Sequence, residues 1–328
     1  MTDNFSNFPN GVTSFGIPVF GSGALMTQGN SWFVRPSSGV DSTSYGKSPS
    51  KPFKTLAYAL SQATANQNDV IYLMAESNTA ANTTDYQSVT LDWNKDLVHL
   101  VGVCAPSKFS QRARIAQLST ATGVSPLVKV SANGCIIANV SIFHGVADNT
   151  SLIALEVTGQ RNTFLNCHIA GIGNATQVTA GAMSLKLTGA SENLFKNCVI
   201  GLDTITRDQN CTEVSCASSA TRNVFEDCWI DSYISNAGFA SVTIGANGID
   251  RSLGFKNCKF TAKSSNKGVG QTSVFSIPAI SQGAIILENS MAFSDGGTVD
   301  WDSNNRGIIW NNTVAAAASA AGGIATNQ

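Results

Sequence analysis

The sequence predicts an all-β protein that folds as a single-stranded right-handed parallel β-helix, a solenoid in which one chain winds through stacked coils of short strands. One sequence motif returns in phase with a period near 30 residues. Repeats of about 20 to 50 residues are typical of solenoids, propellers and arrays. The segments around the motif are short, rich in β-branched and aromatic residues, and separated by Gly, Asn and Ser, which favours strands over helical repeats.

The motif has four clear copies: RNTFLNCHIAGI at residues 161–172, then ENLFKNCVIGL, RNVFEDCWIDS and SLGFKNCKFTA. Their cysteines lie 31, 30 and 30 residues apart. Positions that repeat are expected to face the interior, and positions that vary are expected to face outward. The repeated positions form three predicted ladders: Phe164, Phe195, Phe225 and Phe255; Asn166, Asn197, Asp227 and Asn257; and Cys167, Cys198, Cys228 and Cys258.

Each copy of the motif is expected to supply one strand of a coil, which two further short strands complete. Successive coils then lie about 4.8 Å apart, so equivalent side chains stack. The Phe and Cys side chains pack on their own copies, and the Asn amides hydrogen-bond along an interior corner. An outer ladder of alternating charge is expected at Lys196, Glu226 and Lys256. Weaker copies of the Asn position extend the series to seven coils, at Asn139, Asn289 and Asn312.

This pattern resembles the pectin-lyase-like right-handed parallel β-helix family, in which Asn ladders at one turn are common. The resemblance covers roughly residues 65 to 315 and rests on the phased motif. It implies the fold, whereas function depends on the side chains placed on that fold.

The chain divides into four expected parts: an apolar N-terminal arm at 1–30, a lead-in with a capping helix at 31–66, the β-helix at 67–315, and a low-complexity tail at 316–328. Residues 51–66 predict a short amphipathic helix with an apolar face, and a solenoid needs such a cover at its open end. The arm is apolar without periodicity, so it is expected to lie on a partner subunit.

The charge and cysteine content of the chain limit the kinds of partner and cofactor that we expect. The chain has 20 Lys and Arg against 21 Asp and Glu, so we expect neither nucleic acid nor a membrane as partner. Its start, MTDNFSNFPN, lacks the features of a secretory signal. The eight cysteines form no C-x-x-C pair, and neither a structural metal nor a cofactor is expected.

The resemblance also implies what an enzyme of this family would carry: aspartates that include Asn-Thr-Asp and Asp-Asp in hydrolases, or calcium-binding aspartates and a basic residue in lyases. The sequence contains neither Asn-Thr-Asp nor Asp-Asp. Asp203 and Asp231 fall at different phases of the repeat, Asp300 and Asp302 are expected in a solvated loop, and His168 is expected on the surface. The chain is therefore expected not to be an enzyme.

The first functional hypothesis is a virion protein. The opening segment resembles the start of β-helix proteins encoded among tailed-phage structural genes, which implies a capsid decoration or stabilising protein. By that resemblance it would be a homotrimer, assembled in the host cytoplasm and bound to the major capsid protein or other virion subunits. The expected contact residues are Phe8, Pro9, Phe15, Ile17, Pro18 and Phe20 in the arm, and the basic cluster Lys108, Arg112 and Arg114.

The alternative is a tail spike or receptor-binding β-helix that binds or cleaves host surface polysaccharide. Its distinguishing feature would be acidic and aromatic residues grouped on one external face, for which Trp229 with Asp231 is the best candidate. A free bacterial polysaccharide lyase is a third hypothesis, against which the absence of a recognisable signal counts.

Overall fold

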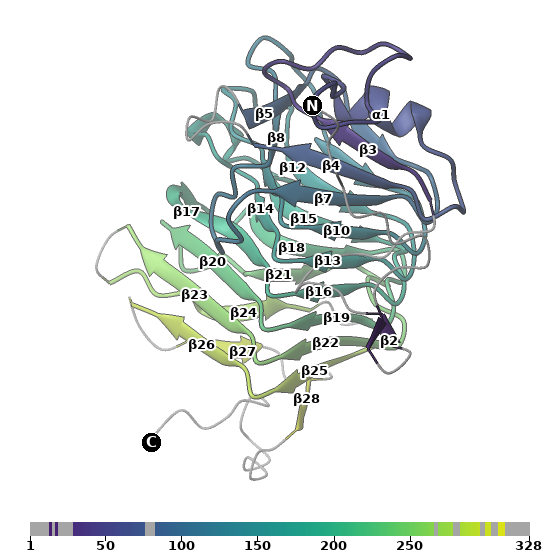
Figure 1. Ribbon diagram of the computed structural model, residues 1–328. Coiled ribbons are helices and arrows are strands. Elements are labelled where there is room, and N and C mark those ends of the chain that lie inside the picture. Colours follow the sequence, from purple (N-terminus) through teal and green to yellow (C-terminus); the bar gives the residue numbers. More distant parts are fainter. Residues whose placement is uncertain are drawn as a thin grey trace.

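The computed structural model describes residues 29–75, 83–265, 268–277, 283–295 and 299–302, together with the backbone of 13–14, 17–18 and 308–311. Three parallel sheets of ten, eight and eight strands run through this part of the chain (Figure 1). Neighbouring strands in each sheet come from successive coils, which is the arrangement of a parallel β-helix. The predicted all-β parallel β-helix is confirmed. Among these residues, no helix is long and apolar enough to cross a bilayer.

The three sheets are numbered by their order within a coil, and the ten-stranded sheet is the first. The ten-stranded sheet consists of β3 (Ser31–Val34), β4 (Val70–Met74), β7 (His99–Val103), β10 (Ile136–Ala138), β13 (Thr163–Leu165), β16 (Leu194–Lys196), β19 (Asn223–Glu226), β22 (Ser252–Lys256), β25 (Ala284–Glu288) and β28 (Ile308–Asn311). The second sheet follows it in each coil and consists of β5 (Thr84–Gln87), β8 (Arg114–Gln117), β11 (Ser141–Phe143), β14 (His168–Ala170), β17 (Val199–Arg207), β20 (Trp229–Ile234), β23 (Lys259–Ser264) and β26 (Met291–Ser294). The third sheet completes the coil with β6 (Leu91–Trp93), β9 (Val128–Val130), β12 (Ile153–Val157), β15 (Met183–Thr188), β18 (Thr212–Ala217), β21 (Val242–Ile244), β24 (Ser273–Ser276) and β27 (Asp300–Asp302).

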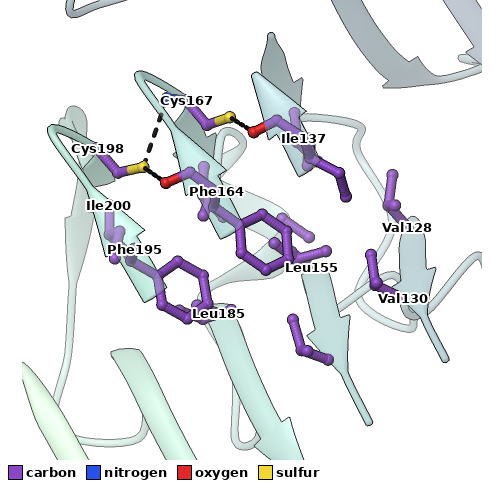
Figure 2. Close-up of a cluster of buried hydrophobic side chains, with 14 of the residues drawn as sticks. Val128, Val130, Ile137, Leu155, Phe164, Cys167, Leu185, Phe195, Cys198 and Ile200 are labelled. Atoms are coloured by element: carbon purple, nitrogen blue, oxygen red, sulfur yellow. Dashed lines mark hydrogen bonds between the residues drawn. The ribbon is translucent and has the colours of Figure 1, made fainter. Parts of the chain in front are cut away.

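Part of the interior consists of stacks of identical side chains. The rings of Phe164, Phe195, Phe225 and Phe255 are buried and nearly parallel, with centroids 4.5, 4.7 and 4.8 Å apart. The buried thiols beside them donate to carbonyl groups of the preceding coil; Cys198 Sγ lies 3.4 Å from the oxygen of Phe164 (Figure 2). The same bond recurs from Cys228 and Cys258. Each coil therefore satisfies the next one's thiol, so no polar atom of this ladder is buried without a partner.

The predicted Asn ladder lies at the turn between the first and second sheets. Asn166, Asn197, Asp227 and Asn257 have φ values of 51° to 55°, a left-handed conformation that Asn and Asp adopt more readily than most residues. Asn197 Nδ2 donates to Asn166 Oδ1 at 3.1 Å, and Asn257 Nδ2 donates to Asp227 Oδ1 at 3.1 Å. The turn is only partly the interior corner that the sequence predicts, because Asn166 is buried, Asn197 and Asp227 are half-buried and Asn257 is exposed.

A second Asn ladder, which the repeat analysis missed, lies inside the helix. Asn162, Asn193 and Asn223 are buried before the Phe strands. The Oδ1 atoms of Asn193 and Asn223 accept from the backbone N–H of Asn162 and Asn193, at 2.9 and 3.1 Å. The signal was present in the sequence, since an Asn stands two residues before the Phe in three of the four motif copies.

Helix α1 (Leu56–Gln62) packs against β3 and β4 at the N-terminal end of the stack (Figure 1). It is shorter than the predicted 51–66 and begins after Thr55, whose Oγ1 accepts from Tyr58 N at 3.2 Å. Leu56 and Leu60 join the main hydrophobic core. The role of this helix as a cap, and the division of the chain into four parts, stay predictions.

Most of the predicted arm lies outside the described residues, including Phe8, Pro9, Phe15 and Phe20, and so does the predicted tail. Within the arm, β1 (Thr13–Ser14) pairs antiparallel with β2 (Ile17–Pro18).

The ring stack predicts a strong asymmetry between neighbouring positions of β19. Phe225→Asp would bury an unpaired carboxyl between two rings, and we expect it to lower the free energy of unfolding by roughly 3 to 5 kcal/mol. Val224→Asp is the matched control, because Val224 is 38% exposed and points outward. Urea unfolding of both variants is the measurement; equal destabilisation would contradict the assigned facing of this strand.

Candidate active site

Acidic, basic and aromatic side chains meet on the outer face of the second sheet. Alternate residues of a strand point to the same side, so Trp229 and Asp231 of β20 share this face with Thr261 and Lys263 of β23. The register places Asp231 directly beside Thr261. Asp203 joins them from β17, and we name these five residues the acidic cluster.

A β-bulge brings Asp203 into the acidic cluster. The register between β17 and β20 shifts between Leu202 and Thr206, which makes residues 203–205 extra in β17. Bulges commonly redirect a side chain near a functional site. This insertion is why Asp203 and Asp231, at different phases of the sequence repeat, contact the same lysine.

Lys263 bridges the two carboxylates. Its Nζ lies 2.5 Å from Asp203 Oδ2 and 3.5 Å from Asp231 Oδ2. The side chains of Lys263 and Asp203 are 41% and 40% exposed, whereas that of Asp231 is 2% exposed. Thr261 Oγ1 donates to Asp231 Oδ1 at 2.5 Å and accepts from Trp229 Nε1 at 2.6 Å. Asp231 is thus the inner carboxyl and Asp203 the outer one.

The surroundings move the pKa values of the two carboxyl groups in opposite directions. The hydrogen bond from Lys263 lowers the pKa of Asp203 below its usual range. Burial raises the pKa of Asp231, although Thr261 and Lys263 act against it. Burial would lower the pKa of Lys263, but its hydrogen bond to Asp203 and the charge of Asp231 leave it raised, so the ammonium form is retained.

A buried ion pair fixes the bulge from inside. Arg207 and Glu213 are fully buried, and Arg207 Nε lies 2.7 Å from Glu213 Oε1. Arg207 also donates to the carbonyl of Ile205 in the bulge, and Glu213 accepts from Ser184 and Ser232 at 2.5 and 3.1 Å. A buried pair of charges is tolerated only when such additional hydrogen bonds satisfy it. The position of Asp203 therefore depends on interactions inside the β-helix.

Glycine is required beside this ion pair. Gly201 has a φ of 102°, and a Cβ there would lie 2.2 Å from the carbonyl oxygen of Asp231 and 2.7 Å from the carboxyl carbon of Glu213. A larger residue would push β17 away from β20 next to the bulge.

The loop at residues 104–113 covers His168 of β14. The prediction that His168 is a surface residue is therefore wrong. His168 is 2% exposed, its Nδ1 accepts from Ser110 N at 3.0 Å, and its Nε2 lies 3.0 Å from the oxygen of Gly201. The Phe109 ring contacts both His168 and Trp229 edge-on. Burial lowers the pKa of His168 to about 4, so the ring is neutral at pH 7 with its proton on Nε2.

The predicted basic contact residues do not form one exposed cluster. Lys108 and Arg112 are exposed on the covering loop, where Lys108 Nζ lies 3.5 Å from the oxygen of Asp227. Arg114 instead lies on β8, half-buried, with its guanidinium 5.0 Å from the centroid of the Phe143 ring.

The second acidic pair also differs from its prediction. Asp300 and Asp302 lie in strand β27 and not in a solvated loop, and Asp302 is fully buried. Among the residues that the structure describes, no group of three or more His, Cys, Asp or Glu side chains is arranged to hold a metal ion.

Comparison with known proteins identifies the fold. No family model and no curated protein matches this sequence. Among solved structures, pectate lyase Pel9A matches 87% of this chain and 68% of its own, with a TM-score of 0.61 and 14% identity. A rhamnogalacturonan lyase matches 81% of this chain and 69% of its own, with a TM-score of 0.54 and 15% identity. ORF18 of Geobacillus virus E2 matches 73% of this chain and 57% of its own at a TM-score of 0.39 and 11% identity, too low to support a conclusion about origin.

The chain is therefore a parallel β-helix protein whose fold is similar to that of pectate lyase Pel9A and of a rhamnogalacturonan lyase. At these identities the likeness shows the fold and assigns no activity. It does overturn the expectation that the chain is not an enzyme. That expectation rested on two missing motifs, whereas pectate lyase Pel9A and the rhamnogalacturonan lyase, whose fold the chain shares, are enzymes by name.

The shared lysine predicts how the two carboxyl groups respond to its loss. In Lys263→Met, the pKa values of Asp203 and Asp231 should both rise, because Lys263 lowers each of them. Carboxyl ¹³C NMR titration measures this directly. Lys259→Met, on the same strand and face, is the control and should change neither. Unchanged pKa values in Lys263→Met would mean that the bridge does not exist in solution.

Proposed function

We propose that this protein binds a polysaccharide on the outer face of the second sheet and hydrolyses it at the acidic cluster. One observation carries the proposal: two carboxyl groups, with pKa values moved apart by their surroundings, share one lysine beside an aromatic ring. Pairs of carboxyl groups with separated pKa values mark the acid and base of glycoside hydrolysis. This is also the feature that distinguishes the polysaccharide hypothesis from a purely structural role.

The geometry gives each group a role. Asp203 is exposed and ionised at neutral pH, so it removes a proton from the attacking water or attacks directly. Asp231 keeps its proton to a higher pH than an ordinary carboxyl and donates it to the leaving oxygen once Lys263 turns outward. Lys263 stays protonated, which favours hydrolysis over an elimination that would use this amine as the base.

Aromatic and apolar side chains extend the surface on both sides of the acidic cluster. Phe109 is 39% exposed next to Trp229. On the other side, Phe293 of β26 is 51% exposed and lies in register with Thr261. Exposed apolar groups around a few polar ones are typical of a binding surface, and they support a sugar chain lying across several coils.

The test is release of reducing ends from a panel of neutral and acidic polysaccharides, including bacterial surface polysaccharides, by the full chain. Asp203→Asn should lower kcat by roughly 100-fold or more on the polymer that is cleaved. Glu226→Gln is the matched control, because this carboxylate pairs with Lys196 in the outer charge ladder away from the acidic cluster. Full activity of Asp203→Asn, an unsaturated product, or no cleavage across the panel would each reject hydrolysis at this site.

A virion role is a separate proposal. The apolar composition of residues 1–30 supports attachment of the chain to a capsid or to other virion subunits as a homotrimer, and exposed Lys108 and Arg112 suit an acidic neighbour. A virion-bound β-helix that cleaves host polysaccharide would combine both proposals.

Attachment through the arm predicts that truncation removes it. The full chain should cosediment with phage capsids that lack this protein, whereas a chain beginning at Ser31 should remain in the supernatant. Circular dichroism of the truncated chain checks that it is folded. Cosedimentation of both chains would reject the arm as the attachment, and cosedimentation of neither would reject the capsid role.

A further inference from the structure

A second hollow opens on the outer face of the second sheet, nearer the N-terminal end. It has a volume of about 180 Å³ and lies over β5, β8 and β11. Its origin is a small residue between two large ones: Ala116 lies in register with Tyr86 on one side and Phe143 on the other. The methyl group of Ala116 leaves a gap between the two rings. We name this gap the Ala116 pocket.

Two glycines leave room for the Phe143 ring that forms one wall of the Ala116 pocket. A Cβ on Gly145 would lie 2.5 Å from the Phe143 ring, and a Cβ on Gly173 would lie 2.9 Å from it. The ring therefore rests on bare backbone. The guanidinium of Arg114 lies over the same ring, 5.0 Å from its centroid, in cation–π contact. The pocket thus has one fixed aromatic wall with a cation against it.

Arg114 has no anionic partner within the described chain. None of the ion pairs formed by the described residues includes it. Its neighbours in register are Thr84 and Ser141, which carry no charge. Burial, together with the charge of Arg112, lowers the pKa of Arg114. A partly buried cation without a counter-charge is costly, and a bound anion removes that cost.

The polar side chain next to Arg114 also lacks a partner. Ser141 is 1% exposed, and its Oγ is buried without a hydrogen-bond partner. Buried hydroxyl groups are normally hydrogen-bonded; this one lies in register with Arg114 but is not among the residues that line the Ala116 pocket.

We propose that the Ala116 pocket binds a carboxylate or phosphate group carried on a single small ring, with Arg114 as its ion-pair partner and Tyr86 and Phe143 as its walls. The volume admits a group of about one ring and no more. A guanidinium donates two parallel hydrogen bonds to such planar or tetrahedral anions. Tyr86 is 46% exposed, so the pocket is reached from solvent.

This site is distinct from the acidic cluster. β8 lies three coils from β17 and four coils from β20, which corresponds to about 14 to 19 Å at the usual strand spacing. The acidic cluster holds two carboxyl groups for one lysine and disfavours anions, whereas Arg114 favours them. The anion belongs either to a free small molecule or to a sugar acid within a polymer, and both sources offer the same chemistry to the pocket.

Isothermal titration of the full chain tests the proposal with glucuronate, benzoate and inorganic phosphate as probes, and with glucose as the neutral control. We expect at least one anion to bind while glucose does not. Arg114→Gln should weaken that binding at least tenfold, whereas Arg112→Gln, which removes an exposed charge nearby, should leave it within twofold. Absence of binding by every anion, or equal loss in the two variants, would overturn the proposal.

Ala116→Leu provides a variant that keeps the charge and fills the pocket. It should abolish anion binding without lowering the melting temperature, because the larger side chain enters the hollow and not the main hydrophobic core, to which Ala116 does not belong; retained binding would overturn the proposal. Comparing glucuronate with a glucuronate polymer separates the sources, since tighter binding of the polymer indicates a sugar acid in a chain and equal affinity indicates a free anion. Because the readout is binding, its failure is distinguishable from failure of the proposed hydrolysis.

Discussion

In-register stacking of parallel coils is the constraint on which the rest of the structure depends. Each interior side chain meets the side chain at the equivalent position of the next coil about one strand spacing away, so at several positions a residue that packs well in one coil favours the same residue in the next. The Phe164 and Phe195 rings lie 4.5 Å apart at an angle of 4° for this reason. The outer faces carry no such restriction, because their neighbours include solvent. Side chains that differ from coil to coil, such as those of the acidic cluster, therefore lie on the outer face.

The acidic cluster arises where the stacking departs from its register. Within the described strand pairs, the shift falls between β17 and β20, next to Asp203. Extra residues in one coil would disturb the coils around it unless something inside absorbs them. The buried pair of Arg207 and Glu213 does so, because its hydrogen bonds reach the bulge and the neighbouring strands. The position of Asp203 on the outer face thus depends on the buried pair of charges.

The sequence predicts the features that repeat with the period of the motif, and it predicts few of the others. The Phe and Cys stacks and the bridge between Lys196 and Glu226 follow directly from the spacing of the motif. The bulge has no periodic signal, so Asp203 could not be placed beside Asp231. The burial of His168 depends on Ser110, 58 residues earlier, in a loop that folds back over the sheet. Such long-range contacts between irregular segments leave no pattern in a single sequence.

The same loop divides the outer face of the second sheet into two regions of opposite electrostatic character. The Ala116 pocket presents the Arg114 guanidinium, which forms no ion pair within the described part of the chain, and the acidic cluster presents two carboxyl groups held by one ammonium. Between them, Phe109 lies over a neutral His168. Arg114 on β8 lies three to four coils from the two carboxyl groups, about 14 to 19 Å at the usual strand spacing, which exceeds one Debye length at physiological ionic strength, so an anion at Arg114 changes the pKa difference between Asp203 and Asp231 little. In the two proposals above, a polymer that carries anionic groups is held at one end of the face while Asp203 and Asp231 act on another of its units.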